Sequence, residues 1–396
     1  MADARLKDRI DQLAGGAASL AGRDVLLTWQ HEDVAIRFVL LAARILERAV
    51  RAGLPTRAFD RGLGISIFRD KSTRTRYAFR AGCNLLGLAT EELDESTSQV
   101  AHGETVRETA AMIGFLTEIV GIRDDMFLGE GHRYMTEVAA SLDESARAGI
   151  LLQRPAVINL QCDLDHPTQS LADLRHLAAT FNGLEGLAGK RIAITWAHSP
   201  SYGKPMSVPQ GAVSLFSRFG THVVLAHPPG YELAEEPLEA ARRSARESGG
   251  SLTVADSMDA AFEGADVVYP KSWAPVAVMR ERTALRTGGR SAQLADLERA
   301  ALAQNAQHEP WECTAARMRR TRGGRALYMH CLPADITGVN CRAGEVSRDV
   351  FEAARLDTYR EAAYKPFVVA ALVLATRVPD AVDRLRRLAD RLESVS

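Results

Sequence analysis

The fold of this chain is decided by residues 63–76, Leu63-Gly-Ile-Ser-Ile-Phe-Arg-Asp-Lys-Ser72-Thr73-Arg74-Thr75-Arg76. A short apolar run typical of a β-strand gives way to a polar, cationic loop, and a helical pattern begins at Tyr77. Ser72 is a candidate N-cap residue for that helix. Because free backbone N–H groups and the helix dipole attract anions at a helix start, and the hydroxyls and guanidiniums add donors, we predict a phosphate-binding site. The alternative is a well-capped surface helix whose arginines are solvated.

The composition restricts the classes of protein that fit. A length of 396 residues is typical of two domains rather than one core, and a formal net charge of −1 argues against a nucleic-acid-binding protein. The longest apolar run, Pro366 to Ala375, is too short to cross a membrane, and the N-terminus lacks the pattern of a signal peptide. Five scattered cysteines without Cys-x-x-Cys spacing suit a reducing compartment and argue against a structural zinc site. We therefore expect a soluble, cytoplasmic protein without a bound metal.

Strand-like and helical segments alternate along the chain. The strand-like runs are residues 63–68, 156–162, 191–197, 222–227, 265–270 and 326–332. Helical patterns follow several of them, at residues 207–219, 233–247 and 347–356. This alternation predicts an α/β fold with parallel sheets. Residues 170–190 are expected to form a long helix that leads into a domain junction, and a helix over residues 361–376 or more is expected to cross back to the first domain.

Polar and cationic side chains follow three of the predicted strands. The segments are Asp163-Leu-Asp-His166-Pro167-Thr168-Gln169, Pro270-Lys271-Ser272-Trp273 and His330-Cys331-Leu332-Pro333. Ligands bind at the carboxyl ends of parallel strands, so these groups and the Ser72–Thr75 loop are expected to face one crevice that binds an anionic substrate. Each segment alone is also compatible with a structural turn, since a histidine next to proline is often a hydrogen-bonded turn residue.

Three of these motifs carry a family resemblance. Ser72-Thr-Arg-Thr-Arg76, His166-Pro-Thr-Gln169 and His330-Cys-Leu-Pro333, in this order, resemble the signature motifs of the aspartate/ornithine carbamoyltransferases, and the resemblance extends over essentially the whole chain. Ser98-Gln99-Val-Ala-His102-Gly-Glu104-Thr105 is similar to the family's mobile loop, which reaches the active site of a neighbouring subunit. Three further segments resemble segments of the family. The segment of Arg123 is similar to the one that carries the arginine on the carbamoyl oxygen, and that of Asn159 to the one whose asparagine contacts the amino-acid substrate. The segment of Arg355 is similar to a motif near the C-terminus whose arginine also reaches carbamoyl phosphate.

The resemblance implies a fold, an assembly and a reaction. It implies two Rossmann-like parallel-sheet domains joined by interdomain helices. A carbamoyl-phosphate-binding domain would comprise residues 1–170 with the C-terminal helix 361–396, and an amino-acid- or ureido-acid-binding domain would comprise residues 171–360. Family members are trimers with shared active sites. They transfer a carbamoyl group between carbamoyl phosphate and an amine without a metal or organic cofactor.

The resemblance also implies roles for individual residues. Carbamoyl phosphate or phosphate would be bound by Ser72, Thr73, Arg74, Thr75, Gln99, Arg123, His166, Gln169 and Arg355. Among these, Thr75, Arg123 and His166 would polarise the carbonyl group and stabilise the oxyanion that develops on it. Gln99 would come from the adjacent subunit. The second substrate would be bound by Asn159, Lys271, Trp273, His330, Cys331 and Leu332.

The second-substrate segments depart from the ornithine enzymes. Those enzymes carry an Asp-x-x-x-Ser-Met-Gly element, where this chain has Tyr269-Pro-Lys271-Ser-Trp273-Ala-Pro275 and no nearby carboxylate for an ammonium group. Lys-Ser-Trp is similar to the N-acylornithine branch, but Asp335 stands where that branch tends to have arginine. Because a buried lysine needs an anionic partner, Lys271 either meets a substrate carboxylate or extends to solvent. We expect an acidic ureido or N-acylated amino acid as substrate.

A proline-rich connection follows the predicted strand at 191–197. Its sequence, Ala197-His-Ser-Pro-Ser-Tyr-Gly-Lys-Pro-Met-Ser-Val-Pro-Gln210, resembles the loop through which knotted carbamoyltransferases thread a neighbouring segment, and an ordinary ordered loop is the alternative. The whole pattern is similar to the knotted, unassigned branch of the family, whose members tend to occur beside genes of purine and ureido-compound catabolism. That similarity implies a ureido acid such as 2,3-diureidopropionate, cleaved by phosphate to release carbamoyl phosphate.

Two other classes of protein are compatible with parts of the pattern. A non-catalytic carbamoyl-phosphate-binding or regulatory relative would keep the fold, but damage to Ser72–Thr75, His166 or Arg355 would be expected, and these residues are intact. A nucleotide-dependent enzyme on a similar sheet would carry Gly-x-Gly-x-x-Gly or Gly-x4-Gly-Lys-Ser/Thr after a strand, and neither sequence follows a predicted strand. The sequence therefore predicts a working carbamoyltransferase.

Overall fold

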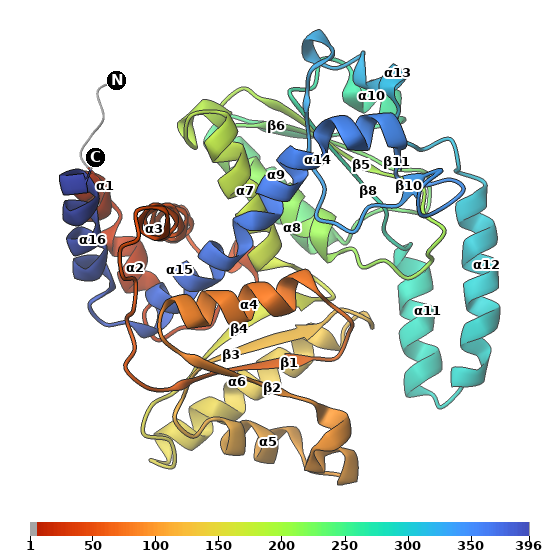
Figure 1. The fold of residues 1–396 in the computed structure, drawn as a ribbon. Coiled ribbons are helices and arrows are strands. Elements are labelled where there is room, and N and C mark those ends of the chain that lie inside the picture. Colours follow the sequence, from red (N-terminus) through yellow and green to blue (C-terminus); the bar gives the residue numbers. More distant parts are fainter. Residues whose placement is uncertain (1–5, 396) are drawn as a thin grey trace.

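The first half of the chain is built on a parallel four-stranded sheet. A computed structural model describes residues 6–395 (Figure 1). The strand order is β2-β1-β3-β4, and every neighbouring pair is parallel. The strands are β1 (Leu63–Phe68), β2 (Ala89–Leu93), β3 (Thr117–Asp124) and β4 (Ala156–Cys162). All seven residues of β4 are buried, as is typical of a strand that is covered on both faces.

The second half is built on a parallel five-stranded sheet with the order β7-β6-β5-β8-β9. Its strands are β5 (Arg191–Trp196), β6 (His222–Ala226), β7 (Ser251–Ala255), β8 (Val267–Lys271) and β9 (Leu327–Tyr328). A separate parallel pair consists of β10 (Ile336–Thr337) and β11 (Val346–Ser347). The predicted α/β fold with two parallel-sheet domains is confirmed.

Helices cover both faces of both sheets. The α-helices are α1 (Leu6–Gln12), α2 (Ala14–Leu20), α3 (Asp33–Arg51), α4 (Arg74–Leu85), α5 (Val106–Ile113), α6 (Gly131–Arg147), α7 (Pro167–Thr180), α8 (Ser207–Phe216), α9 (Glu235–Ser248), α10 (Met258–Phe262), α11 (Val276–Thr287), α12 (Leu294–Ala306), α13 (Ala315–Met318), α14 (Arg348–Ala363), α15 (Lys365–Arg377) and α16 (Ala381–Val395). Short 3-10 turns are η1 (Thr28–Gln30), η2 (Glu95–Thr97), η3 (Gln99–His102), η4 (Glu185–Leu187), η5 (Ser217–Phe219), η6 (Ser291–Gln293) and η7 (Arg322–Gly324). In Figure 1, α4 and α15 lie on one side of the first sheet, with α5 and α6 on the other.

The C-terminal helices return to the first domain. α15 packs against α3, α4 and α7 (Figure 1), and its residues from Val368 to Thr376 are all buried. A helix that is apolar on every side has to be enclosed by other elements, so the apolar run at 366–375 is a core helix. None of the helices within residues 6–395 is long and apolar enough to span a membrane.

The sequence predicted the central strands better than the edges. The strands expected at 63–68 and 156–162 are confirmed, and those expected at 191–197, 222–227 and 265–270 shift by a residue or two. The strand expected at 326–332 is wrong in length, because the chain leaves the sheet after Tyr328. β2, β3 and β7 were not predicted. β2 and β7 are edge strands with several exposed or half-buried residues, so they lack the apolar run of a central strand.

Two helix predictions also need correction. The helix expected at 170–190 ends at Thr180, because Asn182 and Gly183 both take positive φ values and so break the helix. The helix expected from residue 361 onward is three helices, α14, α15 and α16, of which α15 starts with Pro366 in its first turn. The predicted domain division after residue 170 falls inside α7 and stays a prediction, as does the knot in the loop at 197–210.

The order of the strands creates two crevices. In the first sheet, β2 lies on one side of β1 and β3 on the other, so the loops after β1 and β3 diverge above adjacent strand ends. In the second sheet the same divergence occurs between β5 and β8. Such points are where parallel α/β sheets bind ligands. The loops that carry the predicted site residues therefore lie at these two crevices.

Candidate active site

The loop after β1 leads into a helix start without a side-chain cap. α4 begins at Arg74, and its N-cap residue is Thr73, whose side chain makes no capping hydrogen bond. The prediction of Ser72 as N-cap and of a helix start at Tyr77 is therefore wrong by a few residues. The reason is that the chain is already helical at Arg74, so the side chains of Arg74, Thr75 and Arg76 lie in the first turn of α4. Free N–H groups in that turn are suited to an anion.

Arg74, Thr75 and Lys365 come together at this helix start. The Arg74 guanidinium donates through Nη2 to the Leu332 carbonyl, and its Nε is buried without a hydrogen-bond partner. Lys365, the first residue of α15, donates from Nζ to the Thr75 hydroxyl at 3.5 Å and is only 3% exposed. Burial, and after it the Arg74 charge, lowers the pKa of Lys365 to about 7. A bound anion would stabilise the charged form of this lysine.

Arg123 reaches the same place from the end of β3. Its Nη2 lies 2.9 Å from Oδ2 of Asp70 and 2.9 Å from Oδ2 of Asp125, and its Nη1 donates to the side-chain oxygen of Gln161. These three partners fix the plane of the guanidinium. The charge of Arg123 also contributes to the lowered pKa of Lys365. The Arg123 guanidinium is therefore held in one orientation, and its charge acts on Lys365.

His166 lies at the start of α7 and is 3% exposed. Its backbone N–H donates to Oδ1 of Asp165 at 2.7 Å, and its Nδ1 lies 3.3 Å from the Thr168 hydroxyl. Burial, assisted by the charges of Lys365 and Arg123, lowers the pKa of His166 well below its ordinary value. The imidazole is therefore neutral at neutral pH. We call Arg74, Thr75, Arg123, His166 and Lys365 the cationic cluster.

A buried acidic pair lies next to the cationic cluster. Gln169 donates from Nε2 to Oδ1 of Asp173 at 2.6 Å, and the Tyr269 hydroxyl donates to Oδ2 of the same carboxylate at 2.9 Å. The Glu361 carboxylate accepts from the backbone N–H of His330 at 3.1 Å. Burial and the neighbouring Asp173 raise the pKa of Glu361 well above its ordinary value. Gln169 is thus anchored, and the motif at His330 is tied to the end of α14.

The second crevice contains a charge-balanced cluster. Lys271 donates from Nζ to Oε1 of Glu345 at 3.0 Å, and Lys204 lies 3.2 Å from the same oxygen and 2.6 Å from Oδ2 of Asp335. His330 accepts the Leu332 N–H at Nδ1, so its Nε2 carries the hydrogen and donates to Oε2 of Glu345 at 3.1 Å. We call Lys204, Lys271, His330, Asp335 and Glu345 the lysine–glutamate cluster.

Glu345 is the centre of this second cluster. Burial alone would raise its pKa, but the ammonium groups of Lys204 and Lys271 together hold the pKa well below its ordinary value. Lys271 does not extend to solvent, which was one of the two expected outcomes, and a contact with a substrate carboxylate stays a prediction. Its carboxylate partner comes from 74 residues further along the chain. Sequence spacing around Lys271 could not have indicated this contact.

Several other predicted site residues are buried and make contacts within the protein. Trp273 is 1% exposed and donates from Nε1 to the Tyr231 carbonyl at 2.8 Å. Asn159 is fully buried and donates from Nδ2 to the Leu26 carbonyl at 2.6 Å. Cys331 is buried, whereas Leu332, with φ 56°, turns its carbonyl toward Arg74. Within this chain, the contacts of Trp273 and Asn159 are those of core residues.

Gln99 and Arg355 do not reach the clusters of their own chain. Gln99 lies in η3 and is exposed, as is the neighbouring His102. Arg355 is on the exposed side of α14, where it pairs with Glu352 at 3.2 Å. Ser72 and Thr73 precede α4, in the loop that the cationic cluster flanks. The structure therefore brings together the residues of the central motifs and leaves Gln99 and Arg355 outside.

Sequence reasoning missed Lys365, Glu345 and Lys204. A signal for Lys365 did exist, since a lysine directly before Pro366 and the longest apolar run of the chain has to sit at the end of a buried helix. Glu345 had no such signal, because it follows Gly344 in a loop between two short strands. Lys204 lies in the proline-rich loop, and no carboxylate close to it in the sequence indicates its pairing with Asp335 and Glu345.

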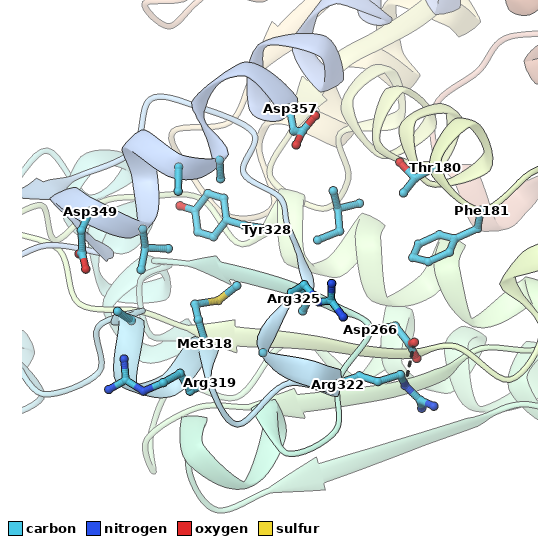
Figure 2. A pocket seen from close by; sticks show the side chains of 17 residues that line it. Thr180, Phe181, Asp266, Met318, Arg319, Arg322, Arg325, Tyr328, Asp349 and Asp357 are labelled. Atoms are coloured by element: carbon cyan, nitrogen blue, oxygen red, sulfur yellow. Dashed lines mark ion pairs between the residues drawn. The ribbon is translucent and has the colours of Figure 1, made fainter.

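A cavity of about 710 Å³ lies elsewhere, between the end of α7, η7 and α14 (Figure 2). Arg325, Asp266 and Phe181 project toward it, and Arg322 pairs with Asp266 at its edge. Asp266 precedes β8 and Arg325 precedes β9, so the cavity is at the amino ends of these strands. Ligands of parallel sheets bind at the carboxyl ends, and none of the predicted site residues lines this cavity.

Comparisons with known proteins give the same family along both halves. The model of "Aspartate/ornithine carbamoyltransferase, carbamoyl-P binding domain" matches residues 23–179, and that of "Aspartate/ornithine carbamoyltransferase, Asp/Orn binding domain" matches residues 206–376. The chain is 55% identical over 355 residues to the protein named "Putative carbamoyltransferase YgeW" of Escherichia coli strain K12, with 90% of each chain covered. It is 27% identical to an ornithine carbamoyltransferase of Ignicoccus hospitalis, with 91% and 99% covered.

Solved structures agree with the fold. An N-acetyl-L-ornithine transcarbamylase is 24% identical, with a TM-score of 0.71 and coverage of 90% of this chain and 100% of that one. An ornithine carbamoyltransferase from Pyrococcus furiosus is 23% identical, with a TM-score of 0.70 and coverage of 91% and 98%. These structures share the two parallel-sheet domains.

Proposed function

The chain belongs to the aspartate/ornithine carbamoyltransferase family, and on this premise we propose that it moves a carbamoyl group between carbamoyl phosphate and the amino group of an amino-acid-like substrate, in the catabolic direction on a ureido acid such as 2,3-diureidopropionate. The observation that carries the transfer is the cationic cluster. Arg74, Arg123 and Lys365 converge beside a neutral, buried His166 at the carboxyl ends of the first sheet. Three cationic side chains around an uncapped helix start are suited to a phosphate dianion.

Different residues of the site bind the phosphate end and the carbamoyl end of carbamoyl phosphate. In this proposal Ser72, Thr73, Thr75 and Arg74 hold the phosphate oxygens with the N–H groups of α4. Arg123 and His166 donate to the carbonyl oxygen, on which negative charge develops. For His166 to donate, its Nε2 carries the hydrogen, and the Thr168 hydroxyl donates to Nδ1 at 3.3 Å instead of to the Leu160 carbonyl at 3.4 Å. Gln169 binds the carbamoyl amide while Asp173 holds its side chain.

The catabolic step is balanced without a further reactant. An oxygen of hydrogen phosphate attacks the ureido carbonyl carbon, and a C–O bond forms as the C–N bond to the amino acid breaks. The phosphate proton passes to the leaving nitrogen, so the products are the free amine and carbamoyl phosphate. No covalent bond forms between the protein and the substrate in this step. The rate therefore depends on the orientation of the reactants and on fixed charge around the carbonyl oxygen.

The second crevice supports a ureido acid rather than an ornithine-like amine. The carboxylates of the lysine–glutamate cluster, Asp335 and Glu345, already pair with Lys204 and Lys271. Within residues 6–395 this leaves no free carboxylate in that cluster to receive a side-chain ammonium. A ureido group is neutral, and His330, Lys271 and Leu332 could meet its amide and carbonyl groups without such a carboxylate.

The direct test is phosphate-dependent release of carbamoyl phosphate from 2,3-diureidopropionate by the purified wild-type chain. We expect release with phosphate and none without it. Release from N-acetylcitrulline or citrulline but not from the ureido acid would overturn the proposed substrate. No transfer in either direction, together with tight binding of carbamoyl phosphate, would favour the non-catalytic binding relative instead.

We further propose a cytoplasmic homotrimer in which Gln99 and His102 act on the neighbouring chain. Both are exposed and lie away from the cationic cluster of their own chain. Mixing Arg74→Ala chains with Gln99→Ala chains should restore activity in part, since some interfaces would then hold both wild-type groups. Verified subunit exchange without recovery would show that the loop works within its own chain or not at all.

A further inference from the structure

Arg282 of α11 is a buried cation without an anionic partner. Its side chain belongs to a residue that is only 8% exposed, and its Nη1 atom is buried without a hydrogen-bond partner. Its neighbours include the Phe127 ring, whose centroid lies 5.1 Å from the guanidinium carbon, the Tyr202 ring at 5.5 Å, and Sδ of Met126 at 4.0 Å from Nη2. No carboxylate within residues 6–395 forms an ion pair with it.

This environment leaves the guanidinium under-compensated. Contact with aromatic faces stabilises a cation by about 0.5–2 kcal/mol, whereas burying an ion without a counter-charge costs several kcal/mol. The backbone of Gly203 also approaches closely, since a Cβ there would lie 2.9 Å from Nη1 of Arg282. The side chain is therefore held in place from several sides, with donors that the protein does not use.

Arg282 contacts the loop after β3 through Met126 and Phe127, and the loop after β5 through Tyr202. Met126 follows Arg123 by three residues, so their Cα atoms are at most about 11 Å apart. On the other side, Tyr202 precedes Lys204 of the lysine–glutamate cluster by two residues. The Thr283 hydroxyl donates to the Leu128 carbonyl at 3.1 Å, which fixes α11 against the loop after β3, and Figure 1 shows α11 beside that end of the first sheet.

Five other cations at these crevices already have a place in one of the two clusters. Arg74, Arg123 and Lys365 form the cationic cluster, and Lys204 and Lys271 are paired with Asp335 and Glu345. We propose that Arg282 binds the carboxylate of the second substrate and so restricts the enzyme to ureido or amino acids with a free α-carboxylate. This inference rests on the proposed carbamoyl transfer, and it replaces Lys271 as the carboxylate receptor. A guanidinium can hold a carboxylate by two parallel hydrogen bonds.

The kinetic test compares Arg282→Met with a matched control, Arg286→Met. Arg286 lies one turn further along α11 and its guanidinium carbon is 4.0 Å from the centroid of the same Phe127 ring, but it is exposed. With 2,3-diureidopropionate and phosphate, Arg282→Met should raise the KM of the ureido acid about 100-fold, with kcat and the KM of phosphate close to wild type. Arg286→Met should stay within about threefold of wild type. Arg282→Lys should recover part of the loss.

A binding test separates this inference from the choice of substrate. N-phosphonoacetylglycine carries a carbamoyl-phosphate mimic and the smallest amino-acid carboxylate, and N-phosphonoacetylglycinamide carries the amide instead. Titration calorimetry should show that wild type binds the acid at least 10-fold more tightly than the amide, and that Arg282→Met removes this difference. If wild type does not cleave 2,3-diureidopropionate but this difference holds, only the substrate proposal fails. Equal preference in wild type and Arg282→Met would overturn the role of Arg282.

Discussion

The cationic cluster and the lysine–glutamate cluster handle buried charge in opposite ways. In the cationic cluster, Arg74 and Lys365 have no carboxylate within ion-pair distance among the described residues, and burial lowers the pKa of both. In the lysine–glutamate cluster, Lys204 and Lys271 share Glu345, whose pKa is held well below its ordinary value. Charge that the protein leaves uncompensated indicates an anionic ligand, while charge that it pairs internally indicates a framework that positions neighbouring groups.

The same comparison separates Lys271 from Arg282. Both are buried cations, but only Lys271 has a buried carboxylate partner among the described residues. A lysine next to a strand end was the natural sequence-based choice for binding a carboxylate. The pairing with Glu345 argues against that role, because neutralised charge attracts a further anion weakly.

The largest effect is expected where the internally paired cluster is broken. Glu345→Gln leaves Lys204 and Lys271 without their shared counter-charge in a buried site, and we expect a loss of about 3–5 kcal/mol of stability, seen as a lower thermal midpoint. The control is Glu352→Gln, which removes an exposed pair with Arg355 and should cost less than about 1 kcal/mol. A midpoint for Glu345→Gln equal to that of the control would show that the cluster does not depend on Glu345.

The next effect concerns Arg74, a member of the cationic cluster that has no carboxylate partner among the described residues. Arg74→Ala should weaken binding of carbamoyl phosphate about 100-fold, because the phosphate oxygens lose a charged donor in a desolvated site. It should leave the thermal midpoint of the free protein near wild type. The control Arg80→Ala lies on the same helix, where it pairs with Glu92 at 3.3 Å and is largely exposed. Near-wild-type affinity of Arg74→Ala in titration calorimetry would remove Arg74 from the phosphate site.

A smaller effect is expected from the titration of Lys365. Its pKa of about 7 in the folded chain lies below the ordinary 10.5, so between about pH 7 and 10.5 the unfolded chain holds one more proton at this residue. Stability should therefore rise with pH in this window, and Lys365→Met should remove that rise. Binding of a phosphate dianion favours the charged amine, so affinity for carbamoyl phosphate should fall about tenfold from pH 7.5 to 8.5.

The control for this titration keeps the charge. Lys365→Arg stays protonated, so it should bind carbamoyl phosphate with an affinity that does not change over the same pH range. Calorimetry in buffers of different ionisation enthalpy should show uptake of a proton by wild type at pH 8.5 and none by Lys365→Arg. Proton uptake by both variants alike would place the titrating group elsewhere.

The smallest effect is expected at Arg355, which the family resemblance placed on carbamoyl phosphate. Because it is exposed on α14 and pairs with Glu352, Arg355→Ala should change the affinity for carbamoyl phosphate less than about twofold. In this structure Lys365, and not Arg355, lies in contact with Thr75. A loss comparable with that of Arg74→Ala would show that α14 rearranges when the ligand binds.

What the sequence determined by itself was local. The α/β class followed from apolar strands that alternate with helical patterns. The proposed phosphate site followed from Ser72–Arg76, because a strand end, a loop and a helix start are contiguous in the chain. His166 and Gln169 follow their strand in the same way. Such segments carry their own geometry, since the donors of one helix start need no distant residue to be placed.

What only the tertiary structure decided were the contacts between segments far apart in the chain. Lys365 meets Thr75 across 290 residues, and Glu345 meets Lys271 across 74. The roles of Lys271, Trp273 and Asn159 depended on those partners, and the unpaired state of Arg282 could be recognised only once its neighbours were known. The physical reason is that the cost of a buried charge or polar group is set by what surrounds it, and those surroundings come from the return path of the chain.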